Sequence, residues 1–384
     1  MGDAVDMETT DLIKFRRELH QNPELSGEET ETSQRVQRFI EKFKPDSTIK
    51  EIGGEGLAFF FDGNQEGKTI LVRAELDALP IDEINDFEYK SRSQDKAHKC
   101  GHDGHMAILA GVARELSGSR PERGRVILLF QPAEETGEGA SRMLHDVKFG
   151  NIKPDFVFAL HNLPGFKEGS ILVREEVFSS ASVGIEIKLG GKTSHAAEPE
   201  KGINPAGATA RIVQDLLNVS NRKDLFEDFV LATIVHIKLG EIAYGTSAGH
   251  AVIRATLRSY RNEDMEVLKS EAEKIAKKNA EQDHLNIGMR YVEYFPALIN
   301  NPESVNIIRD AARANNFTVE ELSHPFRWSE DFSHFTEKFR GAMFGLGAGL
   351  DTPKVHNPDY DFPDTLIKPG IKMFTTIINQ ITNS

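Results

Sequence analysis

Cysteine, net positive charge and long apolar runs are scarce in this chain of 384 residues. It holds one cysteine, so no disulfide can form within the chain. Lysine and arginine number 46 against 60 aspartate and glutamate residues, and the formal net charge of −14 lacks the basic footprint of a nucleic-acid-binding protein. No apolar run approaches the roughly 20 residues that a membrane-spanning helix needs. We therefore expect neither nucleic acid nor membrane as a partner.

The N-terminal stretch MGDAVDMETTDLIKF also lacks a targeting signal. It is acidic and polar, without the apolar region of a signal peptide. Its sixth residue is aspartate rather than serine or threonine, so it matches a myristoylation signal poorly. Together with the single cysteine, these features predict a cytoplasmic protein.

Predicted strands alternate with predicted helices over much of the chain. Short apolar runs predict strands at 56–62, 69–76, 125–130, 155–160 and 342–349, and helical spacing predicts helices at 11–21, 105–117, 140–147 and 303–315. A further helix is expected to begin at Ser26, because acidic residues follow it where the first turn would lie. The alternation predicts an α/β sandwich with a largely parallel sheet.

The segment from about 180 to 293 has a different pattern. It is predicted to run strand, helix, strand, strand, helix, strand, which is the ferredoxin-like order. A chain of this length is also too long for one ordinary core. We therefore expect a ferredoxin-like domain at 180–293, inserted into a first domain formed by 1–179 and 294–384.

Side chains that could bind a metal follow several of the predicted strands or precede a predicted helix. They are Asp77, Cys100, His102, Glu134, Glu135, His161 and His356. The carboxyl ends of parallel strands share one edge of a sheet, and ligands bind at that edge. We therefore expect these side chains to lie close together.

The residue types in this set favour a transition-metal site. Cysteine, histidine and carboxylate are zinc-type ligands, and the mixture suits Zn, Mn, Co or Ni better than Ca or Mg. Each residue alone has an ordinary explanation, since a lone cysteine is usually a small buried apolar side chain. Only the joint pattern argues for a metal. A nucleophilic Cys100 with His102 as its base is an alternative, but it leaves the other histidines and Glu135 unexplained.

Several longer stretches are specific to one group of enzymes. They are FRRELHQNPELSGEE (15–29), VRAELDALPI (72–81), HKCGHDGHMA (98–107), FQPAEETGEGA (130–140), LHNLPG (160–165), GKTSHAAEPEKGINP (191–205), TLRSYR (256–261), SEDFSHF (329–335) and HNPDYDF (356–362). In this order the chain resembles the aminoacylase-like zinc peptidase clan. Within that clan it is similar to the amidohydrolase branch of hippurate hydrolase, auxin-conjugate hydrolases and N-acetyl-diaminopimelate deacetylase. The resemblance covers essentially the whole chain.

The resemblance implies a metal-dependent amidohydrolase that cleaves N-acyl amino acids. Two divalent ions, Zn²⁺ or Mn²⁺ with Ni²⁺ or Co²⁺ as alternatives, would be bound by Cys100, His102, Glu135, His161 and His356, with Cys100 as the bridge. Glu134 would be the general base. His195 would reach in from the inserted domain, which would act as a lid and as the interface of a homodimer. Arg258 would bind the substrate carboxylate as a bidentate fork or else pack within the lid.

The chain departs from the family pattern at two places. Wider clan members carry a metal-binding histidine where this chain has Glu75, so His102 would take over as a ligand and Asp77 would orient one. Relatives usually read NVIP before the TLR strand, whereas this chain reads GTSAG at 245–249. In the clan that asparagine helps hold the substrate, so the second departure concerns substrate recognition rather than metal chemistry.

Two rival functions compete with the amidohydrolase. A metallo-aminopeptidase or dipeptidase of the same clan would need to recognise a free amino group, and the CGHDGH and HNLPG motifs favour the amidohydrolase branch instead. A non-catalytic metal-binding protein on this fold would be indicated by loss of Glu134 or of a ligand, and none is lost.

Overall fold

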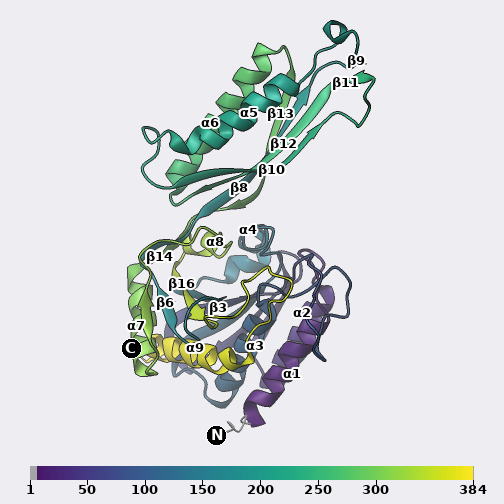
Figure 1. The fold of residues 1–384 in the computed structure, drawn as a ribbon. Helices are drawn as coiled ribbons and strands as arrows, with labels where there is room; N and C mark the ends of the chain where they lie inside the picture. Colours follow the sequence, from purple (N-terminus) through teal and green to yellow (C-terminus); the bar gives the residue numbers. More distant parts are fainter. Residues whose placement is uncertain (1–6, 384) are drawn as a thin grey trace. The chain divides into compact units, whose positions relative to one another are not determined.

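The computed structural model describes residues 7–383 and divides the chain into two compact units (Figure 1). The larger unit holds the chain up to Phe178, Leu298–His324 and the chain from Asp331 onward, and the smaller unit holds Ser179–Ala297 and Pro325–Glu330. An inserted domain was expected at 180–293. The short return at 325–330 was not expected, because it depends on contacts distant in sequence. Ser180 Oγ donates to the Arg327 carbonyl at 2.6 Å, for example.

Within the described residues, the larger unit contains an eight-stranded mixed sheet in the order β1-β2-β4-β3-β5-β16-β6-β15. The strands are β1 (Ser47–Ile52), β2 (Gly56–Asp62), β3 (Gln65–Glu75), β4 (Arg123–Gln131), β5 (Phe156–Leu163), β6 (Ile171–Val173), β15 (Val319–Glu321) and β16 (Arg340–Gly347), and a separate pair is formed by β7 (Glu176–Ser179) and β14 (Leu298–Asn300). The central strands β4, β3, β5 and β16 are parallel, whereas β1, β2 and the β6–β16 pair add antiparallel neighbours. The predicted α/β class is confirmed, with a sheet that is parallel mainly at its centre.

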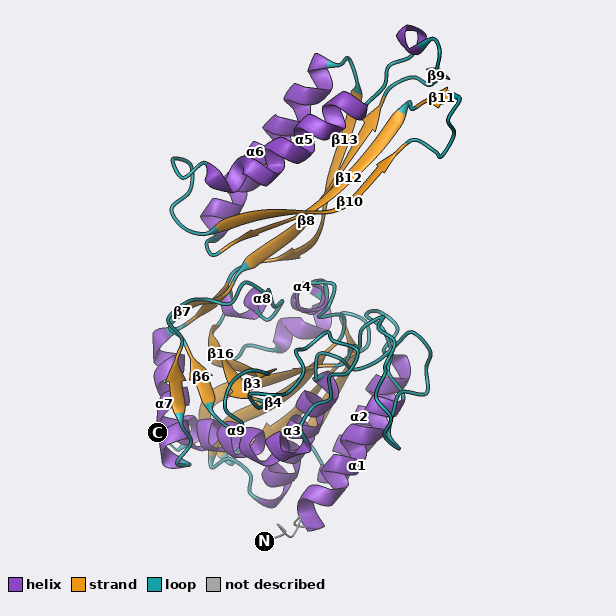
Figure 2. Ribbon diagram, in the orientation of Figure 1, coloured by secondary structure: helices purple, strands orange, loops and turns teal. Residues whose placement is uncertain are grey.

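Helices cover both faces of this sheet (Figure 2). They are α1 (Met7–Gln21), α2 (Thr30–Ile40), α3 (His102–Gly118), α4 (Gly139–His145), α7 (Pro302–Ala314), α8 (Ser333–Thr336) and α9 (Ile367–Thr382), with 3-10 turns η1 (Glu41–Phe43), η2 (Val147–Asn151) and η5 (Asp364–Leu366). Because α3 and α9 lie on one face and α4 and α8 on the other, strands such as β4 and β5 are buried almost throughout. None of the helices in residues 7–383 is long and apolar enough to cross a membrane.

Helix α2 begins later than its sequence suggested. Ser26 was expected to cap it, but the Ser26 hydroxyl instead donates to Asp77 Oδ2 at 2.7 Å. The side chain of Glu24 takes the capping role, accepting from the backbone N–H groups of Glu31 and Thr32 at 3.2 and 2.6 Å. The helix therefore starts at Thr30, and the residues before it are used to hold the loop after β3.

The smaller unit is a ferredoxin-like layer of antiparallel strands under two helices. In the described chain its sheet has the order β10-β12-β8-β13. Its elements are β8 (Ala181–Gly190), β9 (Ser194–His195), η3 (Pro199–Lys201), α5 (Ala206–Asn218), η4 (Val219–Asn221), β10 (Val230–Leu239), β11 (Thr246–Ser247), β12 (His250–Ser259), α6 (Asn262–Gln282) and β13 (Asn286–Phe295). The helices α5 and α6 cover one face of the sheet, and β10 forms one of its edges (Figure 2).

A buried ion cluster ties α1 to α3 and to the C-terminal segment. The fully buried Arg16 donates from Nη1 to Asp103 Oδ2 at 3.2 Å and to Asp361 Oδ1 at 2.6 Å, and from Nε to Asp364 Oδ1 at 2.9 Å. Burial alone would raise the pKa of Asp103, but Arg16 and His20 outweigh burial and hold it well below its usual range. Asp103 lies next to His102, so the cluster fixes the start of α3.

Replacing Arg16 with alanine should therefore destabilise the fold strongly. The change leaves the carboxylate of Asp103 buried without its guanidinium partner, which should cost about 3–5 kcal/mol in the free energy of unfolding. Arg17→Ala is the matched control, because Arg17 bonds the same Asp364 at 2.7 Å but its side chain is 43% exposed. That pair should contribute less than about 1 kcal/mol. Urea denaturation compares the two variants, and equal losses would contradict the assignment.

Candidate metal centre

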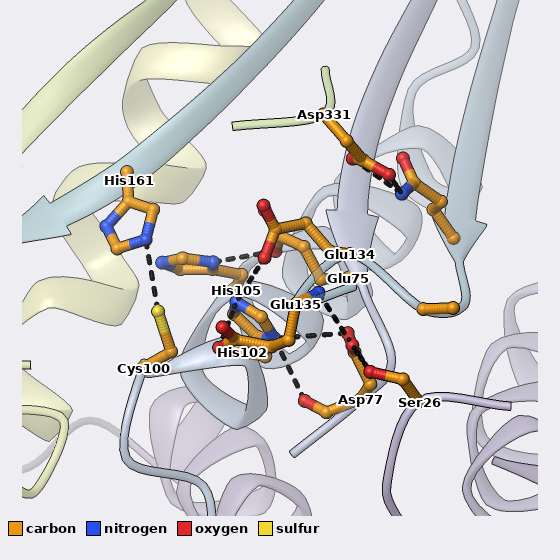
Figure 3. Close-up of polar contacts among 12 residues, drawn as sticks. Ser26, Glu75, Asp77, Cys100, His102, His105, Glu134, Glu135, His161 and Asp331 are labelled. Carbon is orange, nitrogen blue, oxygen red and sulfur yellow. Dashed lines mark hydrogen bonds and ion pairs between the residues drawn. The ribbon is translucent and has the colours of Figure 1, made fainter. Parts of the chain in front are cut away.

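The loops at one edge of the large sheet carry the predicted site residues. Asp77 follows β3, Glu134 and Glu135 follow β4, His161 is part of β5, His356 lies in the loop after β16, and Cys100 and His102 precede or begin α3. Figure 3 labels six of them, all except His356, together with neighbouring side chains, and shows them converging from separate elements. The convergence follows from the parallel centre of the sheet, in which strand ends meet at one edge.

The side chains form overlapping groups with metal-ligand spacing. Cys100, His102 and His161 offer ligand atoms within 4.8 Å of one another, and so do Cys100, Glu135 and His356. A further group joins His102 to Glu134 and Glu135. Cys100 belongs to two of these groups, as expected of a ligand between two ions. Thiolate, imidazole and carboxylate donors in this combination match zinc-type chemistry.

The contacts of His102 fit a cation. Its Nδ1 lies 2.9 Å from the carbonyl oxygen of Asp77, which orients the ring. Its buried Nε2 has no hydrogen-bond partner among residues 7–383, and lies 3.8 Å from Glu134 Oε2 and 3.9 Å from Glu135 Oε1. These separations are too long for hydrogen bonds but leave space for an ion between nitrogen and oxygen.

The charge around His102 supports the same conclusion. Burial lowers the pKa of His102, but its contacts with Asp77 and the nearby carboxylates of Glu75 and Glu135 outweigh burial and raise it to about 10. The surroundings of His102 therefore favour a positive charge at this position. A divalent cation bound to neutral imidazole would supply that charge.

The contacts of His161 suit a neutral metal ligand. Its Nδ1 donates to the Asn162 carbonyl at 2.8 Å, so the lone pair of Nε2 faces Cys100 Sγ at 3.4 Å (Figure 3). Burial and the neighbouring His105 lower the pKa of His161 to about 3, which keeps the ring unprotonated. An unprotonated ring with one nitrogen fixed by a carbonyl is the state in which histidine binds metals.

Glu75 is held as a charge partner. Its carboxylate pairs with Arg73 on one side, and its Oε2 lies 2.7 Å from His105 Nδ1 on the other. His105 Nε2 is in turn 2.6 Å from Asn162 Oδ1, so both ring nitrogens of His105 are occupied. Burial would raise the pKa of Glu75, but Arg73 and His105 lower it well below its usual range. The His105 ring in turn contacts the His161 ring, with centroids 5.2 Å apart and an interplanar angle of 75°.

Two residues beside the site have left-handed backbone conformations that favour glycine. Ala133 has φ 52° and His356 has φ 66°. Both are held by backbone hydrogen bonds, from Ala133 N–H to Glu29 Oε1 and from His356 N–H to the Lys99 carbonyl, each 2.7 Å long. Strain of this kind persists only where surrounding contacts impose it, and it often marks functional loops.

Sequence reasoning missed the residues that brace these loops. His20 lies outside the predicted site, yet its Nδ1 is 2.9 Å from Asp103 and its Nε2 is 3.0 Å from Glu83. Burial lowers the pKa of His20, but these two carboxylates raise it to about 9. Glu29 was also missed, although it supports the residue before Glu134. Both lie in the stretch FRRELHQNPELSGEE, which served above only to support the family resemblance. The many charged residues in that stretch were the available signal.

His195 and Arg258 lie in the smaller unit. His195 is exposed in β9, and its Nδ1 accepts from the backbone N–H of Ala197 at 3.0 Å. Arg258 Nη1 donates to the Arg327 carbonyl and to Ser329 Oγ, each at 2.9 Å. One end of the Arg258 guanidinium therefore packs within the smaller unit, which was one of the two roles considered for it.

Known proteins resemble this chain over nearly its full length. An uncharacterized hydrolase of Staphylococcus aureus, strain bovine RF122, is 33% identical, with 96% of this chain and 97% of the relative covered. The YXEP protein of Bacillus subtilis, a dinuclear metal-binding peptidase of the M20 family, has a TM-score of 0.84 at 24% identity, covering 99% and 100% of the two chains. An aminobenzoyl-glutamate utilization protein of Klebsiella pneumoniae has a TM-score of 0.74 at 17% identity, covering 97% and 95%.

The family model for these proteins matches most of the sequence. The model for peptidase family M20/M25/M40 aligns with residues 71–380, which include the whole set of predicted ligands. The match, the relative of 33% identity and the metal-ligand groups agree. The chain belongs to peptidase family M20/M25/M40, and it is a hydrolase of that family.

Proposed function

We propose that this hydrolase is a metal-dependent amidohydrolase that cleaves N-acyl amino acids to a carboxylic acid and a free amino acid. The observation that carries the proposal is the pair of ligand groups that share Cys100, with the carboxylate of Glu134 next to both His102 and Glu135. Metal-ligand groups alone would also suit a protein that only stores a metal ion. A further buried carboxylate beside them suits a site that moves protons.

The proposed ligands are Cys100, His102, Glu135, His161 and His356. Two divalent ions, Zn²⁺ or Mn²⁺, would polarise the amide carbonyl and make a water molecule acidic enough to lose its proton near neutral pH. The protein's contribution is to fix the donors. Asp77 holds the ring of His102 through its carbonyl, and its carboxylate accepts from the Glu135 backbone N–H at 3.0 Å. Asp77 thus orients the two proposed ligands His102 and Glu135 without binding the metal itself.

Glu134 is the proposed general base. Its side chain is 7% exposed and lies next to His102, so it can reach a water molecule held at the ligand groups while bulk water is largely excluded. It would accept the proton of that water and then deliver it to the leaving amine. Its backbone position is fixed by the preceding Ala133, whose N–H is bound to Glu29.

In the smaller unit, His195 is the proposed catalytic residue and Arg258 the proposed substrate-binding residue. A backbone N–H can only donate, so the bond from Ala197 to His195 Nδ1 requires a lone pair there and leaves the proton of the neutral ring on Nε2. We propose that this N–H donates to the amide carbonyl oxygen as negative charge develops on it. The remaining edge of the Arg258 guanidinium, Nε and Nη2, is suited to a substrate carboxylate.

The substrate class draws support from chemistry and from resemblance. A free amino acid product brings a carboxylate, for which a guanidinium in the smaller unit is an appropriate partner. The branch that the motifs resemble acts on N-acyl amino acids. One structural neighbour is named for aminobenzoyl-glutamate, in which an acyl group is joined to glutamate by an amide.

We also propose that two copies of the chain pair through the smaller unit. Strand β10 is at an edge of its sheet, and Val235, Ile237 and Leu239 on it are 60%, 46% and 42% exposed. An exposed edge strand with apolar side chains is a template for pairing with another chain.

Removing His102 should abolish normal metal binding. We expect His102→Ala to weaken binding by more than the roughly 10–100-fold typical for loss of an outer partner, because a ligand itself is lost. Metal content after dialysis, by mass spectrometry, and the Tm increase on adding Zn²⁺ measure the effect. The control is His145→Ala, an exposed histidine in α4. Unchanged metal content in His102→Ala would remove His102 from the ligand set.

Glu134→Gln should lose turnover while it keeps its metal. Loss of a general acid–base group costs about 10²–10⁴-fold in kcat, and the amide preserves the size of the side chain. A panel of N-acyl amino acids and unblocked dipeptides, assayed with Zn²⁺ or Mn²⁺, also separates the deacylase from a peptidase. Glu138→Gln is the matched control, since Glu138 is exposed four residues away. Full activity of Glu134→Gln with metal bound would show that another group is the base.

Charge placed on β10 should separate the proposed pair of chains. Ile237→Lys buries an ammonium group in an apolar interface, so we expect a shift toward monomer in sedimentation velocity at micromolar concentration. Val147→Lys is the control, because Val147 is 89% exposed in the larger unit. A wild-type chain that sediments as a monomer would refute the pairing.

A further inference from the structure

The segment GTSAG pairs with the strand that carries His195. Strand β11 lies antiparallel to β9, with Thr246 opposite His195 and Ser247 opposite Ser194. The Ala196 N–H donates to the Gly245 carbonyl at 2.9 Å. In an antiparallel ladder, a hydrogen bond between these flanking residues makes Thr246 and His195 a non-hydrogen-bonded pair. This is the type in which the two Cα atoms lie closer together. Their Cα atoms should be about 4.5 Å apart, with both side chains on one face.

The two faces of this short ribbon have different surroundings. On one face, Ser247 Oγ accepts from Asn204 Nδ2 at 2.9 Å. The adjoining loop is anchored by reciprocal backbone bonds between Lys192 and Ile203, 2.9 and 2.8 Å long. The opposite face carries His195 and Thr246, and both residues are exposed. The ribbon is thus fastened through its serine face and presents its histidine and threonine outward.

The base of the ribbon needs a residue without a side chain. A Cβ added at Gly249 would lie 2.4 Å from the backbone nitrogen of Thr193, closer than any real contact. The Gly191 N–H donates to the Gly249 carbonyl at 2.8 Å, so the two strands approach each other closely here. The sequence GTSAG therefore does more than shorten a loop. Its last glycine permits the approach, its serine fastens one face, and its threonine lies beside His195.

We propose that Thr246 is a further catalytic residue, whose hydroxyl donates, together with His195 Nε2–H, to the amide carbonyl oxygen of the substrate. The inference rests on the proposed function and names a second contact for the same oxygen. Two neutral donors side by side suit an oxygen that gains charge during the reaction. A carboxylate carries its full charge from the start and is better matched by a guanidinium such as that of Arg258.

The pair also accounts for the departure of this chain from the NVIP pattern. Gly245 offers no side chain to a substrate, whereas the hydroxyl of Thr246 can both donate and accept. The fixed tautomer of His195 leaves Nε2–H as its outward donor. The hydroxyl of Thr246 can rotate toward the same carbonyl oxygen that His195 Nε2–H would bind. A rigid donor group in its place could adjust less readily.

The kinetic test is Thr246→Val, which removes the hydroxyl and keeps the branched shape. We expect kcat for the best N-acyl amino acid to fall by at least about tenfold with little change in KM, because the bond strengthens only as charge develops. Thr246→Ser should restore most of the rate. The double variant with His195→Ala should lose less than the product of the single losses, since both donors serve one oxygen.

The matched control is Thr318→Val, an exposed threonine of the larger unit, which should behave as wild type. A second measurement needs no turnover and no metal. With methyl-labelled threonine in the metal-free protein, the Thr246 methyl group should show a nuclear Overhauser effect to the His195 ring. Its absence would overturn the shared face.

The outcomes separate this inference from the function on which it rests. If the wild type hydrolyses N-acyl amino acids and Thr246→Val retains its kcat, Thr246 has no role and the amidohydrolase stands. If Thr246→Val and Thr246→Ser lose activity equally, or Tm falls with kcat, the residue is only structural. If the wild type hydrolyses none of the panel, the amidohydrolase proposal fails, and this inference fails with it.

Discussion

The gathering of carboxylates around the buried ring of His102 is the constraint on which the site depends. Three carboxylates and the carbonyl of Asp77 surround a buried imidazole whose Nε2 has no partner among the described residues. Such an arrangement is unfavourable in a protein interior unless a cation compensates for it. Further contacts hold Asp77, Glu75 and the loop before Glu134 in place. Ser26 and the Glu135 backbone bind Asp77, Arg73 and His105 bind Glu75, and Glu29 binds the loop before Glu134.

These secondary contacts come from parts of the chain that are far apart in sequence. The segment before α2 supplies Ser26 and Glu29, and α1 supplies Arg16, which joins Asp103 to the C-terminal segment after His356. The ligand loops are thus fixed by contacts that form only when the whole larger unit is folded. A preformed site lowers the cost of assembling donors around an ion, since less conformational freedom remains to be lost on binding.

The sequence could predict which residues meet, but it could not predict how they are held. Alternating strands and helices place the residues after β3, β4 and β5 at one edge, so the convergence of Asp77, Glu134 and His161 follows from topology alone. The start of α2 could not be predicted, because Ser26 is drawn away by a residue 51 positions later. The same holds for Glu75, whose partners Arg73 and His105 decide its role. Local periodicity carries no information about such contacts.

The short segment 325–330 adds a second pair of chain crossings between the two units. It belongs to the smaller unit, where Arg327 and Ser329 bind Ser180 and Arg258. The next residue, Asp331, belongs to the larger unit and accepts from Gln131 Nε2 at 2.8 Å and from Ala140 N–H at 3.0 Å, on either side of the Glu134 loop. Deleting the one continuous segment Ser179–Ala297 would therefore not remove the whole smaller unit. Its last segment is joined by one peptide bond to Asp331, whose side chain binds residues on both sides of the loop that carries Glu134.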